Sequence, residues 1–334
     1  MRAIKAFGPK DLRLVELPDP APGPGEVLIR VRASGICGSD KEYWLQGPTD
    51  RVYGHEAMGE VAALGEGVKH LRVGERVAVN NVIGCGRCAA CRAGRFVFCP
   101  HRPGRDVNGG YGEMLVAPER NCLRLDGRVS DEAGCLIFDN WGTPYAALKR
   151  NGVGEGDDLV IFGCGPIGLA AAVLAKRFGA YVIAVDPVAY RREAALRLAA
   201  DAALAPGEGT PAAIRELTCG LGASFVLDCS GQGAAYAMGL SALRIGGTFI
   251  AVGEGAQFDL RPSEVLIHRH LRIAGSWYST MAEGREVQEL IVAGAIDPLA
   301  FVTHRVGLAE VPQALARFAS CEEGVLKTVI LIRK

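Results

Sequence analysis

The sequence lacks an excess of charge of either sign, because Lys and Arg together number 37 and Asp and Glu together also number 37. Without a basic excess or a basic tail, neither nucleic-acid binding nor attachment to a membrane surface is expected. Internal repeats and low-complexity tracts are also absent. With 49% hydrophobic and 22% charged residues over 334 positions, the composition is that of a globular chain, and its length favours two domains.

The sequence also lacks a hydrophobic run long enough to cross a membrane. Residues 159–175 carry no charge, but they contain glycines and a proline, and a spanning helix needs about 20 residues. The start, MRAIKAFGPK, lacks the apolar core of a signal peptide. We therefore expect a cytoplasmic protein whose 11 cysteines stay reduced, so that clustered cysteines indicate metal binding before disulfides.

Two patterns of secondary structure divide the chain. Residues 1 to about 150 contain short Val, Leu and Ile runs between Gly and Pro, which predict an antiparallel, barrel-like β-domain. From residue 158, compact apolar strands such as LVIFG and YVIAVD alternate with helical segments such as PIGLAAAVLAKRFG. This βαβ series predicts a parallel sheet covered on both faces. The fold class is therefore expected to be α/β.

The run LVIFGCGPIG places Gly163, Gly165 and Gly168 in G-x-G-x-x-G spacing, between a predicted strand and a predicted helix. The first glycine permits a tight turn, the second lets the backbone approach a pyrophosphate, and the third lets the helix pack closely on the strand. The helix that begins at Pro166 and Ile167 offers free N–H groups to phosphates. The sequence therefore predicts a dinucleotide-binding turn.

The next predicted strand ends at Asp186. A carboxylate at this position can accept hydrogen bonds from the adenosine ribose and repel a 2′-phosphate, so NAD is expected in preference to NADP. Arg191 and Arg192 lie nearby and weaken that preference without reversing it. The alternative interpretation is a glycine-rich turn in an α/β protein that binds no dinucleotide.

A second motif is a C-x2-C-x2-C-x7-C array formed by Cys85, Cys88, Cys91 and Cys99. The two short spacings bring three thiolates around one ion, and a loop returns the fourth. Four cysteine ligands leave no open position, so tetrahedral zinc here would be structural. An iron–sulfur cluster is the alternative, because cysteine-dense runs also hold such clusters.

A second set of metal-ligating residue types is spread over separate segments. Cys37 lies in GICGSDKEYW, and His55 and Glu56 are adjacent in YGHEAMGEV. Zinc binds thiolate, imidazole and carboxylate, and in catalytic sites it keeps one position open for water or substrate. Beside a dinucleotide fold, such an ion can lower the pKa of a substrate alcohol for hydride transfer.

Together these motifs resemble the zinc-dependent medium-chain alcohol dehydrogenases over essentially the whole chain. The resemblance rests on GICGSD, GHEAMGEV with GERV, the cysteine array, GCGPIG, and THR with GVLKTVI near the end. It implies a GroES-like, β-rich catalytic domain of residues 1–150 and 276–334. A Rossmann NAD-binding domain with a doubly wound parallel sheet, residues 151–275, would be inserted in it. It also implies NAD(P)-linked alcohol oxidation and a homodimer or homotetramer.

The resemblance assigns the metal ligands residue by residue. Cys37 and His55 match the first two catalytic zinc ligands, and Glu56 matches a glutamate that either ligates or lies just behind the metal. The third ligand precedes the Rossmann domain, where LIFDNWGTPYAAL offers Asp139. The usual carboxylate-proline pair is absent because Asn140 follows. An alignment shifted by one residue would leave Glu56 to ligate directly.

The resemblance also suggests a proton relay and cofactor contacts. Ser39 matches the hydroxyl that passes the substrate proton onward, and Glu42 stands where the family often has a histidine at the outer end of the relay. A carboxylate can accept that proton through water; the alternative is a solvated surface residue. Val252 is expected at the cofactor. Ser276 and Trp277 are also expected there, because the loop GSWYST that contains them lies near the nicotinamide in the family. Packing between domains is the alternative for Trp277.

For the substrate, GICGSDxxYW is most similar to sorbitol and polyol dehydrogenases. Tyr43 matches an aromatic residue of their substrate pocket, Arg305 in THRV matches a basic residue that binds substrate hydroxyls, and Tyr111 is a further pocket candidate. A polyol, sugar, cyclitol or aminocyclitol is therefore the expected substrate. The LIFD run is similar to threonine dehydrogenases, so an amino alcohol stays open. A non-catalytic dinucleotide-binding relative and a zinc-free quinone or enoyl reductase are the alternatives from other classes.

Overall fold

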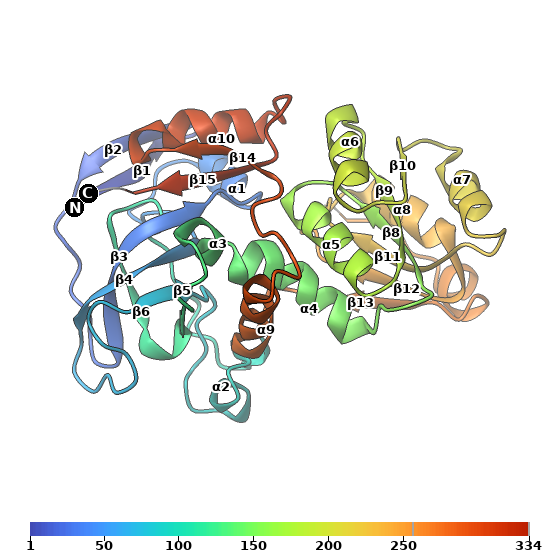
Figure 1. Cartoon of the computed structure of the whole chain (residues 1–334). Coiled ribbons are helices and arrows are strands. Elements are labelled where there is room, and N and C mark those ends of the chain that lie inside the picture. Colours follow the sequence, from blue (N-terminus) through green and yellow to red (C-terminus); the bar gives the residue numbers. More distant parts are fainter. Residues whose placement is uncertain (256, 333–334) are drawn as a thin grey trace. The chain divides into compact units, whose positions relative to one another are not determined.

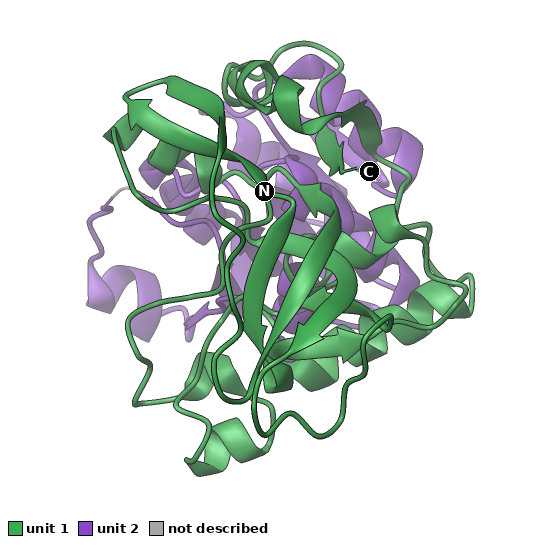
Figure 2. Cartoon of the chain, turned by 90° about the vertical axis from the view of Figure 1, so that its left-hand side faces the viewer, with its two compact units in different colours: residues 1–142, 279–334 green, residues 143–278 purple. Residues whose placement is uncertain are grey.

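The computed structural model describes residues 1–255 and 257–332. It divides into two compact units, which Figure 2 shows in two colours. Unit 1 comprises residues 1–142 and 279–334, and unit 2 comprises residues 143–278.

Unit 1 is built on a seven-stranded sheet with the order β14-β15-β3-β4-β5-β7, in which β6 also pairs with β3 (Figure 1). The pairing of β14 with β15 is parallel, and the other pairings in this sheet are antiparallel. A separate hairpin is formed by β1 and β2. The strands are β1 (Arg2–Gly8), β2 (Asp11–Glu16), β3 (Glu26–Gly35), β4 (Glu56–Leu64), β5 (Arg76–Val79), β6 (Met114–Pro118), β7 (Cys122–Arg124), β14 (Val302–Val306) and β15 (Lys327–Leu331).

Short helices complete unit 1. None of the helices within the described residues is both long and apolar enough to cross a membrane. The helical elements of unit 1 are α1 (Asp40–Gln46), α2 (Ala89–Arg92), η1 (Phe96–Phe98), η2 (Glu119–Asn121), α3 (Asp131–Cys135), the π-helical turn η3 (Ile137–Trp141), α9 (Met281–Val292), η5 (Leu308–Glu310) and α10 (Val311–Ala319).

Buried residues alternate with partly buried ones along β3, and this alternation shows which face of the sheet packs against the core. Val27, Ile29 and Val31 are buried in a core shared with residues of β4, β5 and β6, as the two-residue period of a strand requires. The antiparallel register places Gly35, at the end of β3, opposite Glu56, at the start of β4. The residues that follow β3 and those that precede β4 are therefore held at the same end of the sheet.

Unit 2 contains a six-stranded sheet in the order β10-β9-β8-β11-β12-β13, and every pairing in it is parallel (Figure 1). Its first helix, α4, begins at residue 142, where the chain passes from unit 1 to unit 2. The helix ends at residue 151, where the sequence predicts the start of the second domain. The elements are α4 (Gly142–Asn151), β8 (Asp158–Phe162), α5 (Pro166–Arg177), β9 (Tyr181–Val185), α6 (Ala189–Leu198), β10 (Ala202–Leu204), α7 (Thr210–Leu217), β11 (Ala223–Asp228), α8 (Gly233–Ala242), β12 (Leu243–Ala251), η4 (Ser263–Ile267) and β13 (Arg272–Gly275).

The sequence explains this alternation of strands and helices. Leu159, Val160, Ile161 and Phe162 form an apolar run that is buried in β8, as expected for a strand covered on both faces. Strand order runs outward in both directions from β8 and β11. The loops after these two strands therefore diverge, which is where open parallel sheets bind ligands. The predicted α/β class, with a β-rich unit and a doubly wound parallel sheet, is confirmed.

Candidate metal centres and dinucleotide site

Four side chains of unit 1 converge at the end of the β3–β4 pair. Cys37, His55, Glu56 and Asp139 each place a ligand atom within 4.8 Å of the others. Asp139 Oδ2 lies 3.3 Å from Cys37 Sγ and 2.9 Å from His55 Nε2. Cys37 follows β3, His55 precedes β4, and Asp139 lies in the π-helical turn η3, a kind of turn that is frequent at functional sites. This donor set fits a zinc ion.

Burial and neighbouring charges shift the pKa values of Cys37 and His55. Burial, followed by the negative charge of Asp139, raises the pKa of the Cys37 thiol to about 11. Burial opposes protonation of His55, but Asp40 and Cys37 overcome this and raise its pKa well above the usual value. A bound divalent cation would take over the stabilisation that protons supply here, because it binds the thiolate and the neutral imidazole.

Glu56 has a different environment from the other three residues, because Lys327 faces it. Lys327 Nζ lies 2.7 Å and 2.6 Å from the two carboxylate oxygens and also donates to the carbonyl of Ile36 at 2.9 Å. The two side chains are 1% and 0% exposed. Gly35 makes room for this pair, since a Cβ there would lie 1.9 Å from a Glu56 oxygen.

Burial raises the pKa of Glu56, and the charge of Lys327 opposes that shift. Burial also opposes the charge of Lys327, but Glu56 and Cys37 raise its pKa above the usual value. Lys327 is therefore held in its charged form, and it faces the Glu56 carboxylate as its buried partner. Sequence reasoning missed Lys327, although a lysine in the apolar run VLKTVILI indicates a buried partner for its charge.

Asp40 is the second residue that sequence reasoning missed. Its carboxylate accepts the Cys37 backbone N–H at 2.9 Å and the Tyr111 hydroxyl at 2.5 Å, and it lies 3.4 Å from His55 Nδ1. Ligating histidines commonly bind a carboxylate through the second ring nitrogen. A carboxylate partner for His55 could therefore have been expected, and Asp40, the residue after Ser39, is that partner.

The structure brings Ser39 to the cluster, whereas Glu42 points to solvent. Ser39 Oγ is exposed and donates to Cys37 Sγ at 3.5 Å. Glu42 is exposed on α1, and its side chain has no hydrogen bond or ion pair within the part of the chain that the structure describes. Tyr43 on the same helix is 41% exposed and stacks on Tyr53, with ring centroids 5.0 Å apart.

Tyr111 and Arg305 are not placed on an open face of this cluster. Tyr111 is fully buried, and its hydroxyl is engaged by Asp40. Arg305 lies on β14, where its Nε donates to Glu132 Oε2 at 2.7 Å. Arg305 also lines a surface hollow together with Arg2. Their predicted contacts with substrate therefore have no support from this geometry.

The four cysteines of the lobe form a second candidate metal site. All four sulfurs lie within 4.8 Å of one another, with Cys85 to Cys91 at 3.9 Å and Cys88 to Cys99 at 3.8 Å. A sulfur tetrahedron around zinc, with Zn–S distances of about 2.3 Å, has edges of about 3.8 Å. The same separations are far longer than a disulfide bond of about 2.05 Å. The lobe therefore fits one tetrahedral ion.

Backbone N–H groups surround these sulfurs. Cys99 Sγ accepts from the backbone of Cys85 and of His101, both at 3.3 Å. The backbone N–H groups of Arg87 and Cys88 lower the pKa of Cys85 to about 6. The loop therefore stabilises the thiolate of Cys85, the form that binds metal, whereas burial raises the pKa of Cys91 to about 12.

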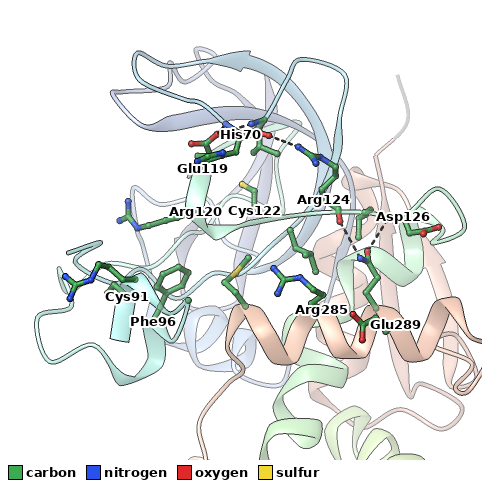
Figure 3. Close-up of a pocket in the computed structure, with 17 residues that line it drawn as sticks. His70, Cys91, Phe96, Glu119, Arg120, Cys122, Arg124, Asp126, Arg285 and Glu289 are labelled. Atoms are coloured by element: carbon green, nitrogen blue, oxygen red, sulfur yellow. Dashed lines mark hydrogen bonds between the residues drawn. The ribbon is translucent and has the colours of Figure 1, made fainter. Parts of the chain in front are cut away.

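A hollow of about 790 Å³ lies beside the lobe in unit 1. Figure 3 shows Cys91 and Phe96 of the lobe on one side of it, and Arg285 and Glu289 of α9 on another. Its lining includes none of the Cys37 cluster. It is therefore separate from the candidate catalytic residues.

In unit 2 the glycine turn and the acidic residue meet at the carboxyl edge of the sheet. Cys164 N donates to Asp186 Oδ2 at 2.7 Å. Gly163 has a φ of 91°, which favours glycine. A Cβ at Gly168 would lie 1.9 Å from the carbonyl oxygen of Gly163, whereas Gly165 faces open space. This arrangement fits a dinucleotide pyrophosphate.

Helix α5 adds donors for phosphate. Its N-cap is Gly165, and no side chain caps its first turn, so the N–H groups of Ile167 and Gly168 stay available. Arg192 donates from Nη1 to the Asp186 carbonyl at 2.7 Å. Arg191 lies with its guanidinium 6.0 Å from the Tyr190 ring centroid.

The remaining predicted cofactor residues follow neighbouring strands. Val252 follows β12, and its N–H donates to the Asp228 carbonyl at 3.0 Å. Ser276 follows β13, and its N–H donates to Ala251 at 2.9 Å. Trp277 is 40% exposed. Because parallel strands end at one edge, Val252 and Ser276 share that edge with the glycine turn.

Comparison with known proteins identifies the family. Residues 23–127 match the alcohol dehydrogenase GroES-like domain, and residues 166–293 match the zinc-binding dehydrogenase domain. Together these domains define an oxidoreductase with a GroES-like unit and a Rossmann unit. The chain belongs to the zinc-type, medium-chain alcohol dehydrogenase family, as the sequence motifs predict.

Three relatives illustrate the range of this family. The chain is 34% identical to the "Uncharacterized zinc-type alcohol dehydrogenase-like protein YphC" of Escherichia coli K12, with 96% of each chain covered. It is 34% identical to an L-threonine 3-dehydrogenase of Rhizobium johnstonii, with 91% of each covered. It is 31% identical to the "Probable D-xylulose reductase A" of Aspergillus fumigatus, covering 96% of this chain and 92% of that protein.

Solved structures agree with this fold. The alcohol dehydrogenase TADH from Thermus sp. ATN1 superposes with a TM-score of 0.89 at 27% identity, over 100% of both chains. A short chain alcohol dehydrogenase from Escherichia coli CFT073, complexed with NADH, gives 0.89 at 26% identity over 99% of both. The "putative zinc-binding dehydrogenase" from Sinorhizobium meliloti 1021, bound to NADP, gives a TM-score of 0.87 at 25% identity, covering 99% of this chain and 98% of that chain.

Proposed function

We propose that the chain is a zinc-dependent dehydrogenase that transfers a hydride between NAD and a secondary alcohol of a polyol, sugar or cyclitol, including aminocyclitols. One observation carries this proposal. Cys37, His55 and Asp139 bring a thiol, an imidazole and a carboxylate together, and the Ser39 hydroxyl lies beside the thiol. A non-catalytic dinucleotide-binding protein has no need of such a combination.

We assign Cys37, His55 and Asp139 as the three protein ligands of a catalytic zinc ion. The charges support Asp139 over Glu56 as the third ligand. Zinc with one thiolate and one carboxylate is neutral overall, and Glu56 is already neutralised by Lys327. Direct ligation by Glu56 would draw it away from a lysine that is 1% exposed, and an unpaired buried charge costs several kcal/mol.

Zinc in this cluster would lower the pKa of a substrate alcohol, and a bound nicotinamide would accept the hydride. The chain's own residues move the proton. Ser39 Oγ is exposed and lies 3.5 Å from Cys37 Sγ, so it can accept the alcohol proton and pass it to solvent. We assign Glu42 no role in passing the proton on from Ser39, because its side chain faces solvent. Asp40 and Lys327 hold the ligands and do not touch the reacting atoms.

We infer that the cysteine lobe holds a structural zinc ion. Its sulfur separations of 3.8 Å and 3.9 Å match one tetrahedral ion. A multi-iron cluster would occupy the space between the thiolates and hold them further apart. With four cysteines as ligands, no position is open for substrate, so the lobe takes no part in the reaction.

For the cofactor we propose NAD, on the position of Asp186 beside the glycine turn. Asp186→Ala should raise KM for NAD by about 10-fold to 100-fold, the effect of losing hydrogen bonds to a charged group. KM for NADP should rise less, because the carboxylate repels a 2′-phosphate. Steady-state kinetics with both cofactors measures this. An equal rise in the two KM values would overturn the ribose assignment.

The substrate class rests on Tyr43, which presents an exposed aromatic ring near the start of α1 and suits a mixed aromatic and polar pocket. The similarity to a D-xylulose reductase supports it. A second candidate, an amino alcohol, is favoured by the similarity to an L-threonine 3-dehydrogenase.

A substrate screen tests the proposed function. Sorbitol, xylitol, inositols, amino sugars and L-threonine are each offered with NAD to enzyme of known zinc content, and NADH formation is followed by absorbance. We expect the highest kcat/KM for a polyol or cyclitol. A clear preference for L-threonine would replace the substrate class and keep the mechanism. Zinc-loaded enzyme that oxidises none of them would refute the proposal.

A further inference from the structure

We propose that Tyr111 is a positioning residue of the metal centre, which holds the Cys37 segment and the His55 segment at one fixed spacing. The sequence places Tyr111 among candidates for substrate contact, but its side chain is 0% exposed. This inference rests on the proposed zinc site.

The phenol hydroxyl of Tyr111 reaches the metal ligands through Asp40. It donates to Asp40 Oδ2 at 2.5 Å, and the same oxygen accepts the backbone N–H of Cys37 at 2.9 Å. The other oxygen, Asp40 Oδ1, lies 3.4 Å from His55 Nδ1. Tyr111 therefore fixes the orientation of a carboxylate that contacts both ligand-bearing segments.

The backbone and ring of Tyr111 reach the His55 segment directly. Its N–H donates to the carbonyl of Tyr53 at 2.9 Å. Gly54, immediately before His55, has a φ of 90°, and a Cβ there would lie 2.5 Å from Tyr111 Cδ1. The ring is therefore in close contact with the residue that leads into the second ligand. On its other side, the Tyr111 carbonyl accepts the N–H of Ile4 from β1 at 2.8 Å.

A residue that holds both segments is needed because the metal ligands come from different parts of the chain. Cys37 follows β3 and His55 precedes β4, and a zinc site tolerates ligand displacements of only about 0.2 Å. Loss of an outer-shell partner typically costs 10-fold to 100-fold in metal affinity or activity. Tyr111 contacts both segments, so one hydroxyl group contributes to the placement of two ligands.

The test compares Tyr111→Phe with Tyr53→Phe, a second buried tyrosine of the same core cluster. Phenylalanine fills the same space as tyrosine and removes one hydroxyl. Each zinc-loaded protein is mixed with excess chelator, and zinc release is followed with a chromogenic indicator. The two zinc ions are assigned by the release kinetics of Cys37→Ala, which retains the lobe zinc alone.

We expect Tyr111→Phe to release the zinc of the Cys37 cluster about 10-fold to 100-fold faster than the unmodified protein. The lobe zinc should leave at an unchanged rate, and Tyr53→Phe should release both ions as the unmodified protein does. Cobalt substituted at the Cys37 cluster should show a shifted ligand-field spectrum in Tyr111→Phe. The spectrum reports ligand geometry without reference to turnover.

Unchanged release and an unchanged cobalt spectrum would overturn the inference. Equal acceleration at both sites would also overturn it, because that result indicates a general loss of stability. If the unmodified protein binds zinc in the lobe alone, that result would refute the proposed catalytic site and the inference with it. The two failures are therefore distinguishable.

Discussion

The two candidate metal sites of unit 1 are assembled in opposite ways. The lobe takes four identical ligands from residues 85–99, and backbone N–H groups surround their sulfurs. The Cys37 cluster takes unlike ligands from three separate segments and is held by the side chains of Asp40 and Lys327. A local cluster is specified by its own loop, whereas a dispersed cluster depends on the register of the whole sheet.

This difference matches the roles we propose. The lobe is saturated with four thiolates and can contribute stability alone. In our proposal the Cys37 cluster supplies three ligands from separate elements, and its fourth member, the carboxylate of Glu56, is neutralised by Lys327. It therefore keeps a position open for substrate. The predictions below test this division, beginning with the largest effect.

The largest expected effect follows from removing the dispersed site. Cys37→Ala should lower kcat/KM by more than about 100-fold, because it removes a ligand rather than an outer-shell partner. NADH binding, measured by fluorescence, should change little, since unit 2 is untouched. Cys219→Ala, at an exposed cysteine, is the control. Full turnover by a Cys37→Ala protein that lacks this zinc would contradict the mechanism.

An intermediate effect is expected in the cysteine lobe, where a substitution should lower thermal stability but change catalysis little. Cys91 is 5% exposed and belongs to the quartet, so Cys91→Ser should release the lobe zinc and lower Tm by about 5 °C or more. At low temperature kcat should stay within a few-fold of the unmodified value. Cys122→Ser, outside the quartet but lining the same hollow, is the matched control. Loss of kcat with an unchanged Tm would reverse the two roles.

The smallest effect is expected at Glu42, at the solvent side of the Cys37 cluster. Its side chain is exposed, so Glu42→Gln should change kcat by no more than about twofold, as is usual for surface substitutions. The pH profile of kcat should keep its shape, with the proton leaving from Ser39 through water. A displaced profile would show that Glu42 takes part in the relay.

The same comparison explains what the sequence could predict. The cysteine quartet and the glycine turn are local patterns. The spacing of the quartet indicates its chemistry, and so does the spacing of the glycines together with the predicted strand and helix on either side. The strands and helices of unit 2 follow from apolar runs between glycines and prolines. These features were predicted correctly at the level of fold and family because short-range sequence determines them.

The outer shell of the dispersed cluster could not be predicted in this way. Lys327 is 271 positions from Glu56, and Tyr111 is 71 positions from Asp40. Only the sheet register brings these partners together. For Arg305 a motif indicated substrate contact, and the structure shows an ion pair with Glu132 that the motif did not predict. The ligand assignment and the substrate contacts remain predictions.

Zinc content per chain tests the division between the two clusters most directly. Elemental analysis is made on the unmodified protein, on Cys37→Ala and on Cys91→Ser, each purified without added metal. The account predicts about two zinc ions in the unmodified protein and about one in each variant. Of the two variants, only Cys91→Ser should retain NAD-linked turnover. A single zinc ion in the unmodified protein, or two in Cys37→Ala, would contradict the account.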